Sequence, residues 1–123
     1  MNNLINTDME KENVILEKSF QFALEIIDFV ELLNENKKFV LSKQLMRSGT
    51  SIGANVRESQ HAESTADFIH KLKIAAKEAE ETEYWLLLCK YSTHYPTNDS
   101  LLSKIEEIQK ILTKIIYTSR NPK

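Results

Sequence analysis

The residues Gly49 to Gly53, with the sequence GTSIG, match the G-x-S-x-G pattern of a hydrolase nucleophile elbow. That motif exposes its serine on a strained turn between a strand and a helix, where a histidine can activate it for acyl transfer. Here the motif lies within a helical repeat of apolar residues, and no strand precedes it. We therefore expect no hydrolase, and we interpret Gly49 and Gly53 as positions of close helix packing.

Two helical elements of the Glu-x-x-His type could ligate metal ions. They are Glu58 with His61 and, as a weaker match to the pattern, Asp67 with His70. A di-iron bundle also needs a glutamate from each of the other two helices at the same level. Glu25 and Glu106 could be nominated, but the two elements flank one turn at an end of the fold. A di-metal carboxylate enzyme is therefore the alternative hypothesis, and we expect no metal, no cofactor and no catalytic residue.

A row of polar side chains runs beside the two glycines. Its members step by three or four residues along one expected helix: Gln44, Ser48, Ser51, Asn55 and Glu58, with Arg47 next to them. A solvated face explains such a row about as well as burial between helices does. If buried, the row forms an interhelical polar network with the following helix.

Antiparallel geometry supplies expected partners for this row. Counted from a turn near residue 63, Arg47 lies level with Ala79 and Glu80. We therefore expect Arg47 to pair with Glu80 or Glu83, and Ala75 and Ala79 to allow the glycines a close approach. Removing one partner of a partly buried pair can cost about 3 to 5 kcal/mol.

Four amphipathic helices must position these residues. The chain has 123 residues, with only two glycines and two prolines, too few to supply the turns of a sheet protein. The helices run from about Val14 to the polar segment 34–38, from about Val40 to His61, from a Ser64 cap to before Pro96, and onward from an Asn98 cap. We predict an all-α fold, an antiparallel up-down-up-down four-helix bundle. Residues 1–123 form one domain, with 1–12 as a flexible tail and 119–123 as a frayed end.

The composition of the chain indicates its cellular compartment and the kinds of partner it can have. The net charge is −2 and the isoelectric point about 5.9, so no large basic face is expected. A single cysteine cannot form an internal disulfide, and no signal peptide or membrane-length apolar run is present. We expect a cytoplasmic protein without a membrane partner.

Some side chains are expected on the surface. The first helix has two apolar stripes, so a second subunit would cover one of them. Trp85 and Leu88 are candidates for a subunit interface. Lys104, Lys110 and Lys114 are candidates for weak, salt-sensitive phosphate contact. Any nucleic-acid binding is expected to be weak and mainly electrostatic.

The central two helices resemble those of bacterial proteins encoded by intervening sequences in large-subunit ribosomal RNA genes. The matching residues of the first helix in this pair are Leu41, Gln44, Leu45, Arg47, Ser51, Ile52, Asn55 and Glu58. Those of the second are Asp67, Phe68, Leu72, Ala75, Ala79, Glu80, Glu83 and Leu86. A more distant resemblance is to the accessory protein of diversity-generating retroelements.

This resemblance implies an antiparallel four-helix bundle that assembles as a homopentameric ring. For the retroelement branch it also implies association with reverse transcriptase and nucleic acid, although the acidic isoelectric point departs from that branch. We expect a non-catalytic oligomeric scaffold or adaptor for a macromolecular partner, such as RNA or a nucleic-acid enzyme.

Overall fold

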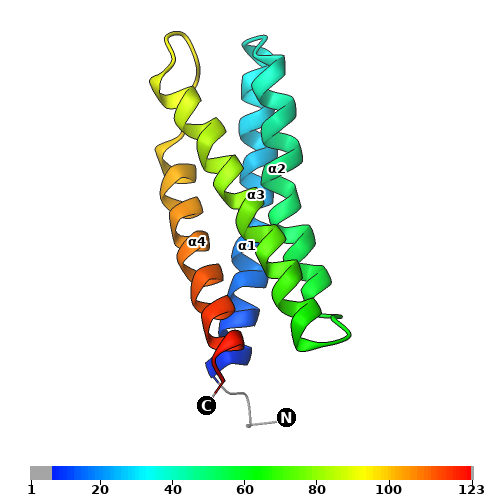
Figure 1. Ribbon diagram of the computed structural model, residues 1–123. Coiled ribbons are helices and arrows are strands. Elements are labelled where there is room, and N and C mark those ends of the chain that lie inside the picture. Colours follow the sequence, from blue (N-terminus) through cyan, green and yellow to red (C-terminus); the bar gives the residue numbers. More distant parts are fainter. Residues whose placement is uncertain (1–6, 123) are drawn as a thin grey trace.

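Four α-helices make up the described part of the chain, residues 7–122 of a computed structural model. They are α1 (Thr7–Glu35), α2 (Phe39–Ser59), α3 (Thr65–Tyr91) and α4 (Asp99–Arg120). No strand occurs between residues 7 and 122. The helices lie side by side and alternate in direction (Figure 1). The prediction of an all-α four-helix bundle is confirmed.

Each helix packs against its neighbours in the sequence, and α4 closes the bundle against α1. The interhelical partners run in opposite order along each pair of helices, as expected for antiparallel packing. Lys18 of α1 pairs with Glu107 of α4 at 3.2 Å, and Glu25 pairs with Lys104 at 2.5 Å. Ion pairs therefore link α1 and α4 at the outer edge of the bundle, while the interior is mainly apolar.

The helix boundaries follow the capping residues. The Ser64 hydroxyl accepts a hydrogen bond from the backbone N–H of Asp67 at 3.0 Å, and the Asn98 side chain accepts one from that of Leu101 at 2.9 Å. Both side chains satisfy N–H groups that have no partner within their helix. The two predicted caps are therefore confirmed.

The first helix is longer than expected. It begins at Thr7 instead of near Val14, so residues 7–12 are helical although we predicted a tail. Methionine, glutamate and lysine in this stretch favour helix, and acidic residues suit the positive end of the helix dipole. At the other terminus α4 continues to Arg120. Residues 1–6 and 123 of the predicted ends lie outside the described residues.

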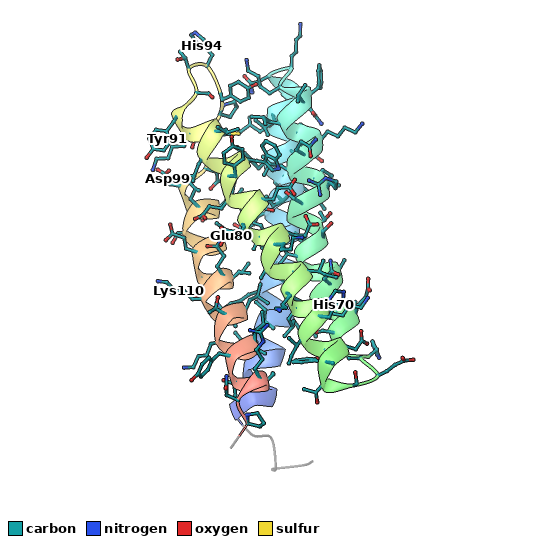
Figure 2. The ribbon with its side chains drawn as sticks, viewed as in Figure 1. His70, Glu80, Tyr91, His94, Asp99 and Lys110 are labelled. Atoms are coloured by element: carbon teal, nitrogen blue, oxygen red, sulfur yellow. The ribbon has the colours of Figure 1, made fainter. Side chains whose placement is uncertain are left out.

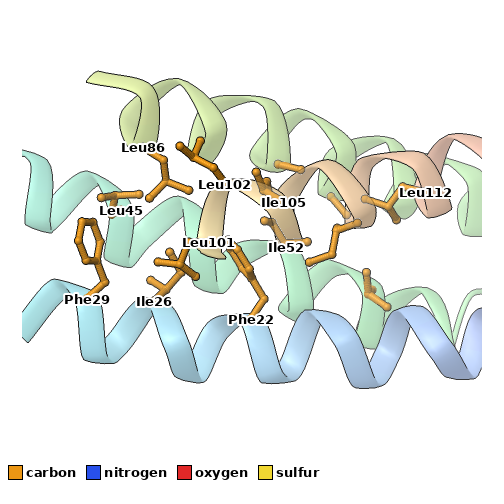
Figure 3. Packing of buried hydrophobic residues seen from close by; sticks show 14 of the residues in the cluster. Phe22, Ile26, Phe29, Leu45, Ile52, Leu86, Leu101, Leu102, Ile105 and Leu112 are labelled. Carbon is orange, nitrogen blue, oxygen red and sulfur yellow. The ribbon is translucent and has the colours of Figure 1, made fainter. Parts of the chain in front are cut away.

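The core is built from one stripe of each helix (Figure 3). In α1 it is the stripe that includes Phe22 and Ile26, which are at most 1% exposed. The other apolar stripe of α1 is only partly buried: Phe20 is 50% exposed and Val30 is 8% exposed, and the remaining members, Leu16, Ala23 and Ile27, are intermediate. The arc of α1 is thus wider than the bundle can bury. The apolar residues of α4 that are spaced by three or four are buried throughout: Leu101, Ile105, Ile108, Leu112 and Ile115.

Candidate interaction surfaces

Arg47 on α2 forms ion pairs with two carboxylates on α3. Its Nη1 lies 3.2 Å from Oε1 of Glu78, and its Nη2 contacts Oε2 of Glu81. Nη2 also donates to the side-chain oxygen of Gln44 at 3.1 Å. The Arg47 side chain is 48% exposed, so this network lies at the surface and its ion pairs are partly screened by water.

The predicted partners of Arg47, Glu80 and Glu83, were wrong. Both accept hydrogen bonds from Gln109 Nε2 of α4 instead, at 3.4 and 3.2 Å. Counting residues from the turn between α2 and α3 gave the correct level along α3, but it did not show which face of α3 lies towards Arg47. Successive residues turn by about 100°, so Glu80 lies about 200° around α3 from Glu78.

Two further members of the polar row bond within their own helix. The Ser51 hydroxyl donates to the carbonyl oxygen of Arg47 at 2.6 Å, and the Asn55 amide donates to that of Ser51 at 2.9 Å. At these two residues the interhelical network predicted for a buried row is therefore replaced by bonds within one helix, as is common for short polar side chains in helices.

Glu58, the last member of the row, reaches the neighbouring helix. Its Oε1 accepts from Nζ of Lys71 at 2.9 Å. This hydrogen bond and the negative charge of Glu58 raise the pKa of Lys71. Among the described residues, the ion pairs between α2 and α3 therefore lie at Arg47 and Glu58, about three turns apart.

The two glycines face α1, not the alanines of α3 as predicted. A Cβ added at Gly49 would stand 2.8 Å from Cγ1 of Ile26, and one at Gly53 would stand 3.3 Å from the carbonyl oxygen of Ser19. The two glycines do allow close helix packing, but they pack against α1 and not against α3. Ala75 and Ala79 are fully buried in the core of α3.

A buried pair of hydroxyl groups, which the sequence patterns did not predict, joins α2 and α3. The hydroxyls of Ser48 and Thr82 are 2.9 Å apart, and both residues have no exposed area. Thr82 Oγ1 also bonds to the carbonyl oxygen of Glu78 at 2.7 Å. A signal was available, because both residues lie in the buried seams of their helices, Ser48 between Leu45 and Ile52 and Thr82 between Ala79 and Leu86.

Trp85 lies next to the Arg47 network. Its indole Nε1 donates to Oε2 of Glu81 at 3.0 Å, and its ring is tilted against that of Tyr84 with centroids 5.3 Å apart. Trp85 and Leu88 are only partly buried, and Tyr84 is 56% exposed. We call the side chains of Tyr84, Trp85 and Leu88 the aromatic surface of α3. Tyr84 was not among the predicted interface residues.

A second apolar surface lies between α1 and α2. A hollow of about 130 Å³ is lined there by Leu16, Phe20, Ala23, Thr50, Gly53, Ala54 and Arg57. The exposed stripe of α1 forms one wall, and the absent side chain of Gly53 deepens the floor. We call this the α1/α2 hollow. It is large enough for one apolar side chain of another molecule.

The sequence match decides the family. Residues 11–114 match the sequence profile of the 23S rRNA-intervening sequence proteins. The chain belongs to this family. A crystal structure of a protein of unknown function from Bacteroides thetaiotaomicron, assigned to the S23 ribosomal protein family, is similar with a TM-score of 0.83. It shares 50% sequence identity, over 88% of this chain and 99% of the other. No curated protein matches the sequence.

The three lysines considered for phosphate contact are not brought together in this member of the intervening-sequence family. Lys104 pairs with Glu25 of α1 at 2.5 Å. Lys110 and Lys114 lie on the outer face of α4, where they line a shallow groove of about 570 Å³ with Tyr117. Figure 2 shows Lys110 pointing away from the bundle. At most two of the three lysines could therefore contact one ligand on α4.

The sites considered for chemistry are not assembled in the described residues of this family member. Residues 7–122 contain no group of three or more His, Cys, Asp or Glu side chains that could hold a metal ion. Ser51 of the G-x-S-x-G motif lies within α2, on no strand-to-helix turn. None of the described helices is long and apolar enough to cross a membrane.

Proposed function

We propose that this protein is a non-catalytic scaffold or adaptor that assembles with copies of itself in the cytoplasm and holds a macromolecular partner, an RNA or a nucleic-acid enzyme. The observation that carries the proposal is the presence of two separate apolar surfaces, the α1/α2 hollow and the aromatic surface of α3. Exposed apolar surface of this kind is typical of association sites. A scaffold needs such surfaces and needs no catalytic residues.

The position of the two surfaces favours a ring. They lie on different helices, so the aromatic surface of one copy can meet the hollow of the next without covering its own. Such head-to-tail contacts are heterologous, and they produce closed rings when the rotation between subunits permits. Tyr84, which is 56% exposed, is of suitable size for the hollow. The family resemblance favours five subunits.

Several features support a role in binding over one in catalysis. Arg47 and Glu81 are engaged in ion pairing across α2 and α3, and Glu25 is neutralised by Lys104. The one cysteine, Cys89, is buried, and burial raises the pKa of its thiol to about 11. A thiol with such a pKa is not a nucleophile at neutral pH.

Light scattering coupled to size-exclusion chromatography tests the proposal. Each chain has a mass of 14.3 kDa, and we expect a particle of about five times that mass at micromolar concentration. A particle of one chain mass over the whole range of concentrations would contradict it. The variant Phe20→Asp, which puts a charge in the hollow, should yield smaller particles. Tyr117→Asp, a matched substitution on exposed α4, should leave the particle unchanged.

A further inference from the structure

Two loops form the end of the bundle that lies away from the start of α1 and the end of α4 (Figure 1). We call it the loop end, and it comprises residues 34–43 and 90–99. Nζ of Lys38 lies 4.7 Å from the centroid of the Tyr95 ring, a cation–π contact that joins the two loops. The two segments contain four lysines and two acidic residues, whereas the whole chain has a net charge of −2. The loop end is therefore locally basic.

Exposed aromatic rings lie among these lysines. Phe39 is 60% exposed and Tyr91 is 78% exposed. Nζ of Lys90 lies 5.7 Å from the centroid of the Tyr91 ring and also pairs with Asp99 at 3.4 Å. Figure 2 shows Tyr91 directed outward below the loop that carries His94. Flat apolar rings beside ammonium groups are the combination that binds single-stranded nucleic acid, by stacking and charge neutralisation.

Each of the two loops contains one residue that has a strained, left-handed backbone conformation although it is not a glycine. Among the described residues, Lys37 and His94 are the two non-glycine residues with positive φ, at 62° and 71°. Lys37 ends α1 with the bonds of a Schellman motif, from Lys38 N–H to Leu33 and from Lys37 N–H to Asn34. Glycine is the usual residue at such a position. Lysine is less favourable than glycine in this backbone conformation, but it places a cationic side chain at the loop tip. Backbone strain that is kept in this way is typical of functional sites.

We infer that the loop end binds single-stranded RNA. This inference rests on the proposed function, in that it identifies the macromolecular partner as RNA and locates its contact. Lys37 and Lys43, which form no ion pair with the described residues, neutralise backbone phosphates. Unpaired bases stack on the rings of Tyr91 and Phe39.

The choice of RNA follows from the polar groups at the loop tips. Ser92, Thr93 and His94 are all exposed, and their side chains supply hydrogen-bond partners for the 2′-hydroxyl groups that distinguish RNA from DNA. Duplex RNA offers no unstacked bases to Tyr91 or Phe39. The number of lysines is small, so binding is expected to be weak, with a dissociation constant of about 10⁻⁵ M at low salt.

Fluorescence anisotropy with a labelled 12-nucleotide single-stranded RNA of mixed sequence tests this inference on the full chain. Tyr91→Ala should weaken binding about tenfold, because one stacked base is lost, and Tyr91→Phe should bind as the parent does. Lys37→Gly should weaken binding about threefold by loss of one phosphate contact. Since glycine relieves the strain, Lys37→Gly should leave the melting temperature unchanged or raise it by up to about 4 °C.

The controls remove one lysine and one tyrosine side chain away from the loop end. Lys77→Ala on the outer face of α3 and Tyr117→Ala near the end of α4 should bind RNA as the parent does. The inference is overturned if no RNA binds at 100 μM protein, which is about ten times the expected dissociation constant. It is also overturned if Tyr91→Ala and Lys37→Gly both bind RNA as the parent does, or if DNA of the same sequence binds with equal affinity. Light scattering on the same samples separates the two proposals, because failure of RNA binding leaves the particle mass unchanged, whereas a monomer contradicts the proposed function.

Discussion

Gly49 of α2 lies so close to Ile26 of α1 that a Cβ added to the glycine would stand 2.8 Å from Cγ1 and 2.9 Å from Cγ2 of the isoleucine. Both of these carbons are attached directly to the Cβ of Ile26, and the residue is fully buried. They cannot move aside without a change of rotamer or of backbone. The glycine therefore sets how closely α1 and α2 approach, which explains why the chain tolerates its unfavourable helix propensity.

Replacing Gly49 with alanine should destabilise the fold. Overpacking a core costs about 1 to 3 kcal/mol, and the better helix propensity of alanine offsets about 1 kcal/mol. We expect a net loss of about 1 kcal/mol in the free energy of unfolding, measured by urea denaturation. The double variant Gly49→Ala/Ile26→Ala should be more stable than the sum of its single changes indicates, because the clash is removed. Additive effects would show that the two residues do not constrain each other.

Replacing Arg47 with alanine should cost less than the sequence suggested. The side chain is 48% exposed, and exposed ion pairs contribute about 0.2 to 1 kcal/mol each. We expect a loss of about 1 kcal/mol in the free energy of unfolding that shrinks at high salt concentration. Lys43→Ala removes a charge on the same helix that forms no ion pair with the described residues, and it should change stability by less than about 0.5 kcal/mol. Equal melting curves for the parent and Arg47→Ala would mean that the network does not stabilise the bundle.

The hydroxyl pair of Ser48 and Thr82 should behave as a coupled unit. Thr82→Val removes one partner and leaves the buried Ser48 hydroxyl without its interhelical bond, which costs about 1 to 3 kcal/mol. The double variant Ser48→Ala/Thr82→Val removes both polar groups and should recover much of that loss. Thermal melts of the four proteins give the coupling energy directly. Independent effects of the two changes would argue against a shared hydrogen bond.

The sequence predicted the elements of this fold well because local signals define them. Ser64 and Asn98 cap their helices as expected, and the buried residues of α3 and α4 are mostly spaced by three and four along the sequence. These features depend on residues close together in the chain. The start of α1 was missed because residues 7–12 carry no apolar period, although helix propensity favours that stretch.

Contacts between helices were harder to predict because they depend on rotation about each axis. An antiparallel count placed Arg47 near the right level of α3, but the angular position selected Glu78 and Glu81 instead of Glu80 and Glu83. The same limit applies to Gly49, which packs against α1 instead of α3. The loop end was not predicted at all, since its lysines and aromatic rings come from segments about 50 residues apart that only the fold joins.

Cys89 gives the protein a pH-dependent stability at alkaline pH. Burial raises the pKa of its thiol to about 11, while an unfolded cysteine ionises near pH 8.5. The thiol's contribution to stability is fully present below about pH 8.5 and declines as the pH rises towards 11. The melting-temperature advantage of the parent over Cys89→Ala should therefore narrow across that range. A constant difference would show that the thiol titrates alike in both states.

The reactivity of the Cys89 thiol should also reflect its burial. Cys89 is 1% exposed, so a thiol reagent such as Ellman's reagent should modify the folded protein slowly at pH 8 and the urea-unfolded protein at once. Rapid modification under folding conditions would mean that the α3 seam opens often or that the thiol is not enclosed.

The two apolar surfaces should show head-to-tail pairing when their variants are mixed. Phe20→Asp leaves the aromatic surface of α3 intact but blocks the α1/α2 hollow, and Tyr84→Asp does the reverse. Both side chains are about half exposed, at 50% and 56%, so the substitutions leave the core unchanged. Each variant alone should be monomeric or nearly so by light scattering, since no copy can offer both complementary surfaces.

An equimolar mixture should then form a particle of two chains and no larger. The intact aromatic surface of the Phe20→Asp chain can occupy the intact hollow of the Tyr84→Asp chain, and the remaining blocked surfaces prevent further addition. If the contact joined two identical surfaces, the Phe20→Asp chain would instead dimerise by itself through α3, or the Tyr84→Asp chain through the hollow. Light scattering of the separate and mixed samples distinguishes these outcomes. A mixture that remains monomeric would overturn the pairing of these two surfaces.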